Sequence, residues 1–423
     1  MLLSSGTAVG QAIVVLSTPL WTRLYPPGQL GLFAVFMACA SFAGAAVTLC
    51  YELAIPNAAE DSEAAPVLLL AMAVSLPCSV ILSASALVLI RADLLSLGQL
   101  PAWAAIALLP VLFANGIFSS LRYWFVRRKG FETISAALVA QGSVRGLLPV
   151  LLGMWHLNWA GLMLGELAAR LVGVWRMFKC ALPHLKECLR NHGWQKAIQA
   201  ARTYRAFPTL LLPSTLLGTL AFTLPIPLVA HYYGASAAGI FFIAQRVTTL
   251  PASFIISSVA DVLHARIADA LRRAPDEIRP VVLKAMRRLA LLGFLVFTPT
   301  AALAPILCKR LFGGEYEQVG MLVAILSPWC FAELVTSPVS RLILVLNRSE
   351  VLVFYNVVSL AAVVVGLSLG HSIGLNFMQA IGVVVVLKTL AYVMYGAILL
   401  KIAHAHVRGK SGAVPPALSA IDN

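Results

Sequence analysis

Charged residues are scarce in this sequence, and acidic residues are the scarcest of them. Only 11% of the 423 residues are charged, with 17 Asp and Glu against 31 Lys and Arg, whereas an ordinary soluble domain carries about 25% charged residues. Hydrophobic residues make up 60% of the chain, and the mean hydropathy is +0.89. A soluble protein of this length needs a charged exterior to stay dissolved. The composition therefore excludes a soluble enzyme, a nucleic-acid binder and a disordered chain.

Several motifs of enzymes and metal proteins are also missing. The sequence contains no Walker A motif, no GxGxxG after a strand, no HExxH and no CxxC. Its seven cysteines are scattered and lie mostly within apolar runs, which is typical of small packing residues. We therefore expect no metal site, no cofactor and no enzymatic activity. Without an ATPase of its own, the chain has to draw energy for transport from an ion gradient, the membrane potential or consumption of the product.

Long, unbroken apolar runs are abundant, and they predict membrane-spanning helices. A spanning helix needs about 20 apolar residues, whereas the strands of a membrane barrel alternate in polarity. Twelve such spans are expected, at residues 2–22, 29–51, 66–90, 102–122, 132–153, 158–178, 207–230, 237–262, 287–308, 319–345, 351–372 and 376–400. The short connectors at residues 155–157 and 372–374 predict tight turns.

The basic residues are distributed unevenly between the two sides of the predicted membrane domain. The connectors after even-numbered spans, together with the adjoining span ends and the tail, carry 23 Lys and Arg, whereas the connectors after odd-numbered spans carry four. Cytoplasmic loops are enriched in Lys and Arg. We therefore expect both termini in the cytoplasm, and we interpret the net charge of +14 as a topology signal instead of a nucleic-acid footprint.

The two halves of the chain repeat each other. With a shift of 208 residues, ten positions between residues 2 and 33 are identical, among them the pairs Thr7/Thr215, Gly10/Gly218, Pro19/Pro227, Tyr25/Tyr233, Gly31/Gly239 and Phe33/Phe241. Because six spans separate the copies, the repeat is parallel, with an axis along the membrane normal. We expect an all-α protein with two six-helix lobes around a central cavity. The lobes are residues 1–181 and 207–400, joined by an amphipathic connector at 182–206 and followed by a cytoplasmic tail at 401–423.

Residues 18–53, TPLWTRLYPPGQLGLFAVFMACASFAGAAVTLCYEL, resemble the opening signature of the Wzx-type polysaccharide flippases for O-antigen and capsule repeat units. The second half repeats parts of this signature from Tyr233 to Pro251, and Leu311–Tyr316 is a further similar stretch. The resemblance implies membership of the polysaccharide branch of the superfamily that also contains multidrug antiporters and lipid II flippases. It further implies alternating access and an undecaprenyl-pyrophosphate-linked oligosaccharide as substrate.

Six charged residues that are assigned to the predicted spans lie away from the basic span ends on the cytoplasmic side, and their sum is +2. Four are cations, Arg145, Arg170, Arg246 and Lys388, and two are acids, Glu166 and Glu333. Charges in a membrane are costly and usually face a cavity or a partner. The net positive charge suits a pyrophosphate, so we predict the four cations as substrate-binding residues. For Arg246, an arginine that extends to the outer interface is the alternative.

Two of these charges are expected to meet. Arg145 lies 11 residues before the turn at His156 and Glu166 ten residues after it, so both lie about 15 Å deep. Arg170 follows Glu166 on the same helix face. The group either faces the cavity or only locks two helices together. Glu333 and Lys388 are expected to pair in the second half. Glu52 and Asp261 end equivalent spans on the cytoplasmic side, as solvated helix ends or as acids for pairing or ion coupling.

The predicted function is therefore a flippase of the bacterial inner membrane for O-antigen, capsule or exopolysaccharide synthesis. Besides its lipid-linked substrate and the bilayer, we expect a polysaccharide polymerase and a chain-length regulator as partners, and no nucleic acid. A multidrug antiporter is one alternative, although cationic drugs would favour acids inside the membrane. A membrane-embedded polymerase or ligase is another, although such enzymes need larger outer loops than this sequence has.

Overall fold

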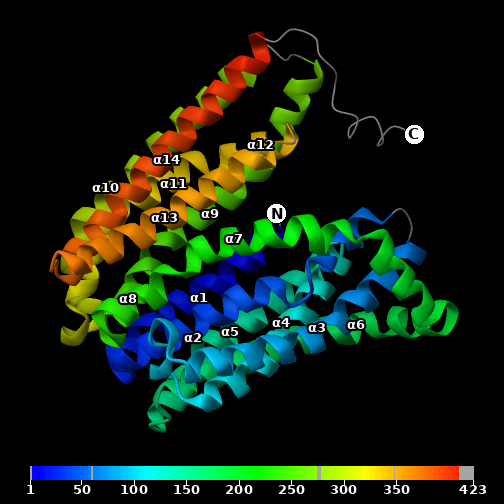
Figure 1. The fold of residues 1–423 in the computed structure, drawn as a ribbon, viewed down its shortest axis with the longest axis horizontal. Coiled ribbons are helices and arrows are strands. Elements are labelled where there is room, and N and C mark those ends of the chain that lie inside the picture. Colours follow the sequence, from blue (N-terminus) through cyan, green and yellow to red (C-terminus); the bar gives the residue numbers. More distant parts are fainter. Residues whose placement is uncertain (1, 59–60, 274–277, 347, 409–423) are drawn as a thin grey trace. The chain divides into compact units, whose positions relative to one another are not determined.

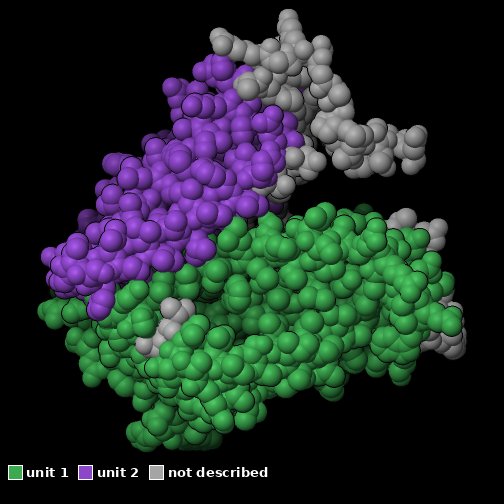
Figure 2. Space-filling view, viewed as in Figure 1, with its two compact units in different colours: residues 1–243, 308–318 green, residues 244–307, 319–423 purple. Residues whose placement is uncertain are grey.

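The computed structural model describes residues 2–58, 61–273, 278–346 and 348–408. Every regular element in these ranges is a helix, and no strand occurs in them. The chain divides into two compact units, shown in green and purple in Figure 2. Unit 1 contains residues 1–243 and 308–318, and unit 2 contains residues 244–307 and 319–423. The expectation of an all-α membrane protein is confirmed.

Unit 1 holds the first eight α-helices and the start of α9 (Figure 1). The helices are α1 (Leu2–Leu24), α2 (Pro27–Ala46), α3 (Asp61–Arg91), α4 (Ala102–Arg127), α5 (Phe131–Met154), α6 (Asn158–Thr203), α7 (Leu212–Thr223), α8 (Pro225–Tyr233) and α9 (Ala235–Arg273). Three short helices lie between them, η1 (Tyr51–Asn57), η2 (Leu94–Gln99) and η3 (Phe207–Leu211). Pro27 and Pro225 begin α2 and α8, where the fixed φ of proline suits the first helical turn.

Unit 2 holds the rest of α9 and most of α10 (Ile278–Phe312), whose last residues return to unit 1. The other elements are η5 (Gly314–Tyr316, in unit 1), α11 (Gln318–Thr336), η6 (Pro338–Ser340), α12 (Arg341–Val345), α13 (Ser349–Ser372) and α14 (Phe377–Arg408). The predicted lobes and these units divide the chain differently. The units group residues by spatial contact and place 207–243 with unit 1, whereas the lobes follow the sequence repeat.

The predicted spans coincide with helices over most of their length, but fewer of them qualify as spans by length and hydropathy. The predicted span 29–51 runs past the end of α2 at Ala46, and the spans 207–230 and 319–345 each cover three consecutive helices. Nine helical segments of the described residues are long and apolar enough to cross a membrane. A tenth is added if the bent pair 194–203 and 207–223 forms one span. Helices α1 and α6 are not among the nine. Helix α6 carries Glu166, Arg170 and Arg176 within its apolar part.

The connector at 182–206 is not a separate helix. Helix α6 continues without a break from Asn158 to Thr203, through Pro183. The two predicted tight turns are present. His156, between α5 and α6, has a φ of 57°, and Gly374, between α13 and α14, has a φ of 75°. Such left-handed residues let the chain reverse directly after a helix.

Glycines bring the helices of unit 1 close together. A Cβ atom on Gly142 of α5 would lie 2.5 Å from the Cα of Gly10 on α1. A Cβ atom on Gly6 would lie 2.7 Å from the Cα of Ser135 on α5. Only glycine permits this approach of the backbones, as in other membrane helix pairs. The resulting contact of α1 with α5 fixes the position of the α5–α6 hairpin, which carries the charged residues of unit 1.

Candidate functional site: an intramembrane charge network and the repeat junction

Arg145 on α5 and Glu166 on α6 form a bidentate ion pair in unit 1. The Nε of Arg145 donates to Oε2 of Glu166 at 2.6 Å, and its Nη2 donates to Oε1 at 2.9 Å. Arg145 lies nine residues before the end of α5 and Glu166 eight residues after the start of α6, and the short turn at His156 joins the two helices into a hairpin. The contact expected from the hairpin is therefore present. Two parallel N–H···O bonds hold the guanidinium plane in one orientation.

Arg170 joins the pair from the next turn of α6. Its Nε donates to Oε1 of Glu166 at 2.7 Å, and its Nη1 donates to Oδ1 of Asn115 on α4. The Nδ2 of Asn115 in turn donates to the carbonyl of Gly44 on α2 at 3.4 Å. One carboxylate thus connects two arginines, and an amide side chain extends the connection to two further helices. We call Arg145, Glu166, Arg170 and Asn115 the charge network.

The charge network has an excess of positive charge. Two guanidinium groups share one carboxylate, so its sum is +1. The carboxylate side chain is 2% exposed, that of Arg170 is 13% exposed and that of Arg145 is 32% exposed. The uncompensated charge is therefore accessible at Arg145. Its Nη1 edge does not take part in the pair with Glu166, so it is available to an anionic group of a ligand.

Lys388 on α14 is the buried cation of unit 2. Its side chain donates to the Oγ of Ser359 on α13 at 2.5 Å, and its Nζ lies 4.8 Å from the ring centre of Trp329 on α11. Lys388 is only 3% exposed. Glu333 on α11 lies one helical turn after Trp329 and interacts with Lys388 electrostatically. Among the described residues, the recorded contacts of Lys388 are with Ser359 and with the rings of Trp329 and Tyr392, and no direct ion pair with Glu333 is found.

The remaining predicted residues, Arg246, Glu52 and Asp261, lie on other helices than these two groups. Arg246 is half-buried in the part of α9 that belongs to unit 2. Glu52 lies in η1 of unit 1, is half-buried and accepts a hydrogen bond from the hydroxyl of Thr48. Burial raises the pKa of the Glu52 carboxyl, and the Thr48 bond opposes that change. Asp261 is a residue of α9, and its side chain lies outside the described part.

A second feature of unit 1 is the contact between the two copies of the sequence repeat. A Cβ atom on Gly31 of α2 would lie 1.8 Å from the carbonyl oxygen of Ala235 on α9. A Cβ atom on Gly239 of α9 would lie 2.0 Å from the carbonyl oxygen of Pro27. In the repeat, Gly31 corresponds to Gly239 and Pro27 to Ala235. The contact is therefore reciprocal, as across a two-fold axis. We call it the repeat junction.

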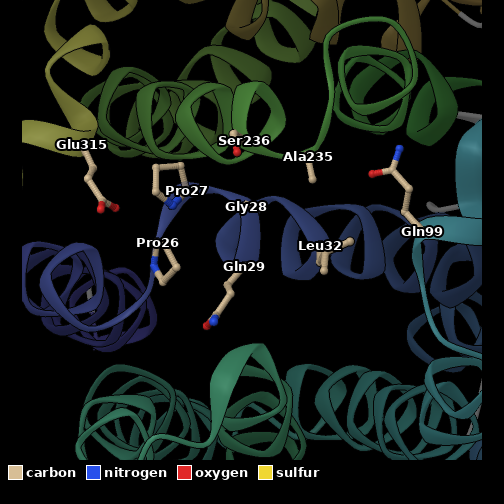
Figure 3. A pocket seen from close by; sticks show the side chains of 9 residues that line it. All are labelled: Pro26, Pro27, Gly28, Gln29, Leu32, Gln99, Ala235, Ser236 and Glu315. Carbon is tan, nitrogen blue, oxygen red and sulfur yellow. The ribbon is translucent and has the colours of Figure 1, made fainter.

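A pocket of about 790 Å³ lies beside the repeat junction (Figure 3). Figure 3 shows Ala235 and Ser236 facing Pro27 and Gly28, and the lining is completed by Pro26, Gln29, Leu32, Gln99 and Glu315. All nine residues belong to unit 1. None of the nine is basic, and Glu315 is acidic. The pocket therefore offers amide, hydroxyl and carboxylate groups but no cation for a phosphate.

Some of these residues were not predicted as functional. Asn115 is a single amide in an apolar span, 55 positions from Arg170, and an amide within such a span is the only signal that the sequence offers for it. Ser359 and Tyr392 give no signal of their own, since hydroxyl-bearing residues are frequent in all spans. In contrast, the repeat junction falls on Gly31 and Gly239, two of the positions that the internal repeat singles out.

Comparisons with known proteins agree on one family and one fold. Residues 20–320 match the family described as polysaccharide biosynthesis protein. No curated protein matches the chain. A multidrug resistance MATE family transporter of the MOP superfamily, solved in an inward-facing conformation, is similar with a TM-score of 0.72 at 15% identity, covering 95% of this chain and 96% of that one.

Two further structures are similar to this chain. The lipid II flippase MurJ, in an inward closed conformation, has a TM-score of 0.72 at 11% identity, covering 95% of this chain and 87% of its own. A MOP superfamily transporter from Pyrococcus furiosus, whose binding pocket is described as having reverse polarity, has a TM-score of 0.64 at 14% identity, with coverage of 96% and 95%. The chain therefore belongs to the polysaccharide biosynthesis protein family, and its fold is that of the MOP superfamily transporters.

Proposed function

We propose that the chain is a flippase that moves an undecaprenyl-pyrophosphate-linked oligosaccharide across the bacterial inner membrane. The observation that carries this proposal is the excess positive charge of the charge network, which is accessible at Arg145. A family engaged in polysaccharide biosynthesis and a transporter fold agree with it. The product would serve O-antigen, capsule or exopolysaccharide synthesis, with a polymerase and a chain-length regulator as the proteins that act on it next.

In this proposal, Arg145 and Arg170 hold the pyrophosphate while Glu166 holds both arginines. A guanidinium matches a pair of phosphate oxygens with its planar set of donors. Because Glu166 occupies one edge of Arg145, the side chain is already oriented before a ligand arrives. Arg246, on the part of α9 that belongs to unit 2, is a separate candidate for a substrate contact, which its own variants test. We do not propose Lys388 as a substrate contact, because its side chain is buried and hydrogen-bonded within unit 2.

The charge balance also discriminates against the first alternative, a multidrug antiporter. A cationic drug would be repelled by a site whose sum is +1, because like charges at short range are destabilising in a medium of low dielectric constant. An anionic lipid head group would be attracted. The second alternative, a membrane polymerase or ligase, needs an outer domain for its acceptor sugar. The described connectors after α1, α5 and α13 contain only two to four residues.

We further propose that the chain consists of two parallel six-helix lobes related by a pseudo-two-fold axis. The reciprocity of the repeat junction supports this arrangement locally. The asymmetry of basic residues supports cytoplasmic positions for both termini. No step of this function breaks or forms a covalent bond, so the proposal assigns neither a cofactor nor catalytic residues.

The proposal is tested by replacing Arg145 and measuring export. In a strain that lacks the chromosomal gene, Arg145→Ala should reach the membrane at a normal level, yet surface polysaccharide should fall at least about tenfold, as expected for the loss of one charge-assisted contact. Arg176→Ala is the matched control, since Arg176 is an exposed arginine on α6 outside the charge network. Normal export with Arg145→Ala, or an equal loss with Arg176→Ala, would contradict the proposal.

A further inference from the structure

The pocket beside the repeat junction is not used by the proposed pyrophosphate site. Its lining comes from four parts of the chain, namely residues 26–32 after α1, Gln99 before α4, residues 235–236 at the start of α9, and Glu315 between α10 and α11. Each of these parts follows an odd-numbered span of the sequence, so in the proposed topology all four lie on the outer side of the membrane. The pocket is therefore on the side to which a flippase delivers its substrate.

The lining of the pocket combines polar groups with apolar surface. The polar groups are two amides, a hydroxyl and a carboxylate, which belong to Gln29, Gln99, Ser236 and Glu315. Two prolines and a leucine supply the apolar surface. Sites for small ligands have this composition, and a volume of about 790 Å³ is within their usual range. A sugar ring is complementary to such a lining, because its hydroxyl groups donate and accept hydrogen bonds while its C–H faces are apolar.

The charge of the lining distinguishes a sugar from a phosphate. None of the nine described lining residues is basic, and Glu315 is acidic. A carboxylate repels a phosphate, whereas it accepts strong hydrogen bonds from hydroxyl groups. Glu315, Gln99 and Ser236 are exposed, so a ligand can reach them from the solvent. The pocket therefore suits the uncharged part of a lipid-linked sugar and not its pyrophosphate.

Both amide side chains are fixed through their nitrogen atoms. The Nε2 of Gln29 donates to Oδ1 of Asn158 at 3.2 Å, and the Nε2 of Gln99 donates to the carbonyl of Ala230 at 3.5 Å. The Oε1 atoms take no part in these two bonds. Figure 3 shows Gln99 and Glu315 at opposite ends of the pocket. Hydrogen-bond acceptors for sugar hydroxyls are thus present at both ends.

A stacked pair of tryptophans lies next to Asn158, the hydrogen-bond partner of Gln29. The rings of Trp103 on α4 and Trp159 on α6 have their centres 4.8 Å apart at an angle of 20°. Trp159 directly follows Asn158 in the sequence and is 8% exposed, whereas Trp103 is 42% exposed. The buried ring supports the exposed one. An exposed indole beside fixed amide groups adds an apolar surface on which a sugar ring can pack.

We propose that the pocket is a subsite for the sugar part of the lipid-linked substrate, an inference that rests on the proposed function. The pyrophosphate binds at the charge network and the sugar binds in the pocket. Arg145 lies nine residues before the end of α5, which places it about 14 Å below the outer end of that helix. Two chemically different sites at different depths thus recognise the anionic and the uncharged ends of one elongated substrate.

Glu315 restricts the sugars that the pocket accepts. Its carboxylate binds hydroxyl groups and the ammonium group of an amino sugar. It repels the carboxylate of a uronic acid, so the same group that attracts one class of sugar excludes another. The ligand is therefore a neutral sugar or an amino sugar.

Binding is measured with a soluble sugar, so that no transport step is needed. Mild acid releases the oligosaccharide of the host strain from its pyrophosphate carrier, and the product is titrated into the purified full chain. Saturation-transfer NMR should show saturable binding to wild type. Glu315→Ala removes a charged acceptor and should weaken binding at least about tenfold. Gly28→Leu places a large side chain in the pocket and should weaken it as much.

Glu317→Ala is the matched control. Glu317 is an exposed carboxylate two positions after Glu315, it pairs with Lys309, and it lies outside the lining of the pocket. Its affinity for the sugar should equal that of wild type. The sugar should also change the tryptophan fluorescence of wild type but not that of Trp103→Phe. A tryptophan that only anchors α4 at the membrane interface would give no response, and this result would remove Trp103 from the subsite.

Three results would overturn the sugar subsite. The first is a wild-type protein that does not bind the oligosaccharide. The second is equal affinity of wild type, Glu315→Ala and Gly28→Leu. The third is displacement of the sugar by inorganic pyrophosphate, which would make the pocket a phosphate site.

The restriction by Glu315 has its own test. The same oligosaccharide, oxidised at its primary hydroxyl groups to uronic acids, should bind wild type at least about tenfold more weakly. The difference between the two sugars should shrink in Glu315→Ala and persist in Glu317→Ala. Equal binding of both sugars to wild type would contradict the restriction.

Export of surface polysaccharide separates this inference from the proposed function. Glu315→Ala should lower export at a normal protein level, whereas Glu317→Ala should not. Normal export with Glu315→Ala, despite weaker sugar binding, would show that the pocket has no part in transport and would overturn the inference. Sugar binding that depends on Glu315, together with normal export in Arg145→Ala, would instead overturn the proposed pyrophosphate site and leave the sugar subsite intact.

Discussion

Glu166 holds the charge network together, because each of its oxygens serves an arginine. Oε1 accepts from Arg145 and from Arg170, and Oε2 accepts from Arg145. Removing the carboxylate leaves two guanidinium groups close together without a counter-charge. Removing Arg145 leaves Glu166 still paired with Arg170. The three residues should therefore contribute unequally to stability.

We expect Glu166→Ala to destabilise the protein by about 3 kcal/mol or more, as for other buried pairs that lose one partner. Arg145→Ala should cost about 1 kcal/mol, because its side chain is partly exposed. Thermal unfolding of the purified variants shows which of the two substitutions lowers stability more. The double exchange Arg145→Glu with Glu166→Arg should recover part of the loss. An Arg145→Ala variant less stable than Glu166→Ala would contradict this account.

Arg246 provides a separate test of substrate contact. Arg246→Lys keeps the charge but loses the planar set of donors, so export should fall partly. Arg246→Ala loses both, and export should fall at least about tenfold. Immunoblots of the membrane fraction should show normal protein levels for both variants. Full export with Arg246→Ala would place this residue outside the substrate path.

Glu52 should make stability depend on pH. Because burial raises the pKa of its carboxyl in the folded protein, the folded state holds the proton more tightly than the unfolded state. Its contribution to stability is present at low pH and is lost as the pH rises from the ordinary carboxyl range through the raised pKa. Thermal midpoints from about pH 4 to about pH 7 should fall more for wild type than for Glu52→Gln. Parallel curves would show that Glu52 does not titrate in this way.

At the scale of helices, the repeat junction fixes how the starts of α2 and α9 meet within unit 1. The glycines at its centre leave no room for a methyl group, since the nearest backbone oxygens lie 1.8 and 2.0 Å from the positions of added Cβ atoms. At Gly28, one turn earlier, an added Cβ atom meets only the Oγ of Ser236, at 3.4 Å. Gly28 and Gly31 should therefore differ sharply in how well they tolerate a larger side chain.

Gly31→Ala should lower stability by about 1–3 kcal/mol, as for other overpacked sites, whereas Gly28→Ala should be nearly neutral. Thermal unfolding of both variants measures the difference. The pair Gly28→Cys with Ser236→Cys should form a disulfide under mild oxidation, because a Cβ atom on Gly28 would lie 3.4 Å from the Oγ of Ser236. If the junction has to open during transport, this bond stops export, and a reductant restores it. Export that continues in the cross-linked protein would show that the junction stays closed.

For the whole molecule, the proposed topology predicts that the C-terminus lies in the cytoplasm. A reporter enzyme that is active only in the periplasm should be silent when fused after Asn423. The same reporter fused after Trp155, in the turn between α5 and α6, should be active, because that turn lies on the opposite side. Activity at Asn423 would reverse the assignment.

The sequence predicts the parts of this fold that depend on one helix or one hairpin. The apolar runs locate the helices, and the short turn at His156 places Arg145 opposite Glu166. Contacts between distant helices could not be predicted. The bond of Arg170 to Asn115 spans 55 positions, and it depends on how α4 and α6 are rotated. Spans that are apolar on all sides carry little information about that rotation.

The surroundings of Lys388 show the same limit. Glu333 and Lys388 could be expected to interact because they are the only charges in the middle of their spans. The recorded contacts of Lys388 with Ser359 and Trp329 depend on which sides of α11, α13 and α14 face one another. The continuation of α6 through residues 182–203 was not predicted either, since its polar composition is compatible with a separate surface helix.

The reciprocity of the repeat junction has a consequence for the history of the gene. If the halves arose by duplication of one coding segment, each substitution in the ancestor changed both sides of the junction at once. After duplication the copies could diverge at most positions. Gly31 and Gly239, however, each still pack against the backbone of the other copy. A recombination that replaces one half by a distant relative's half should therefore succeed only where the incoming segment keeps its own glycine.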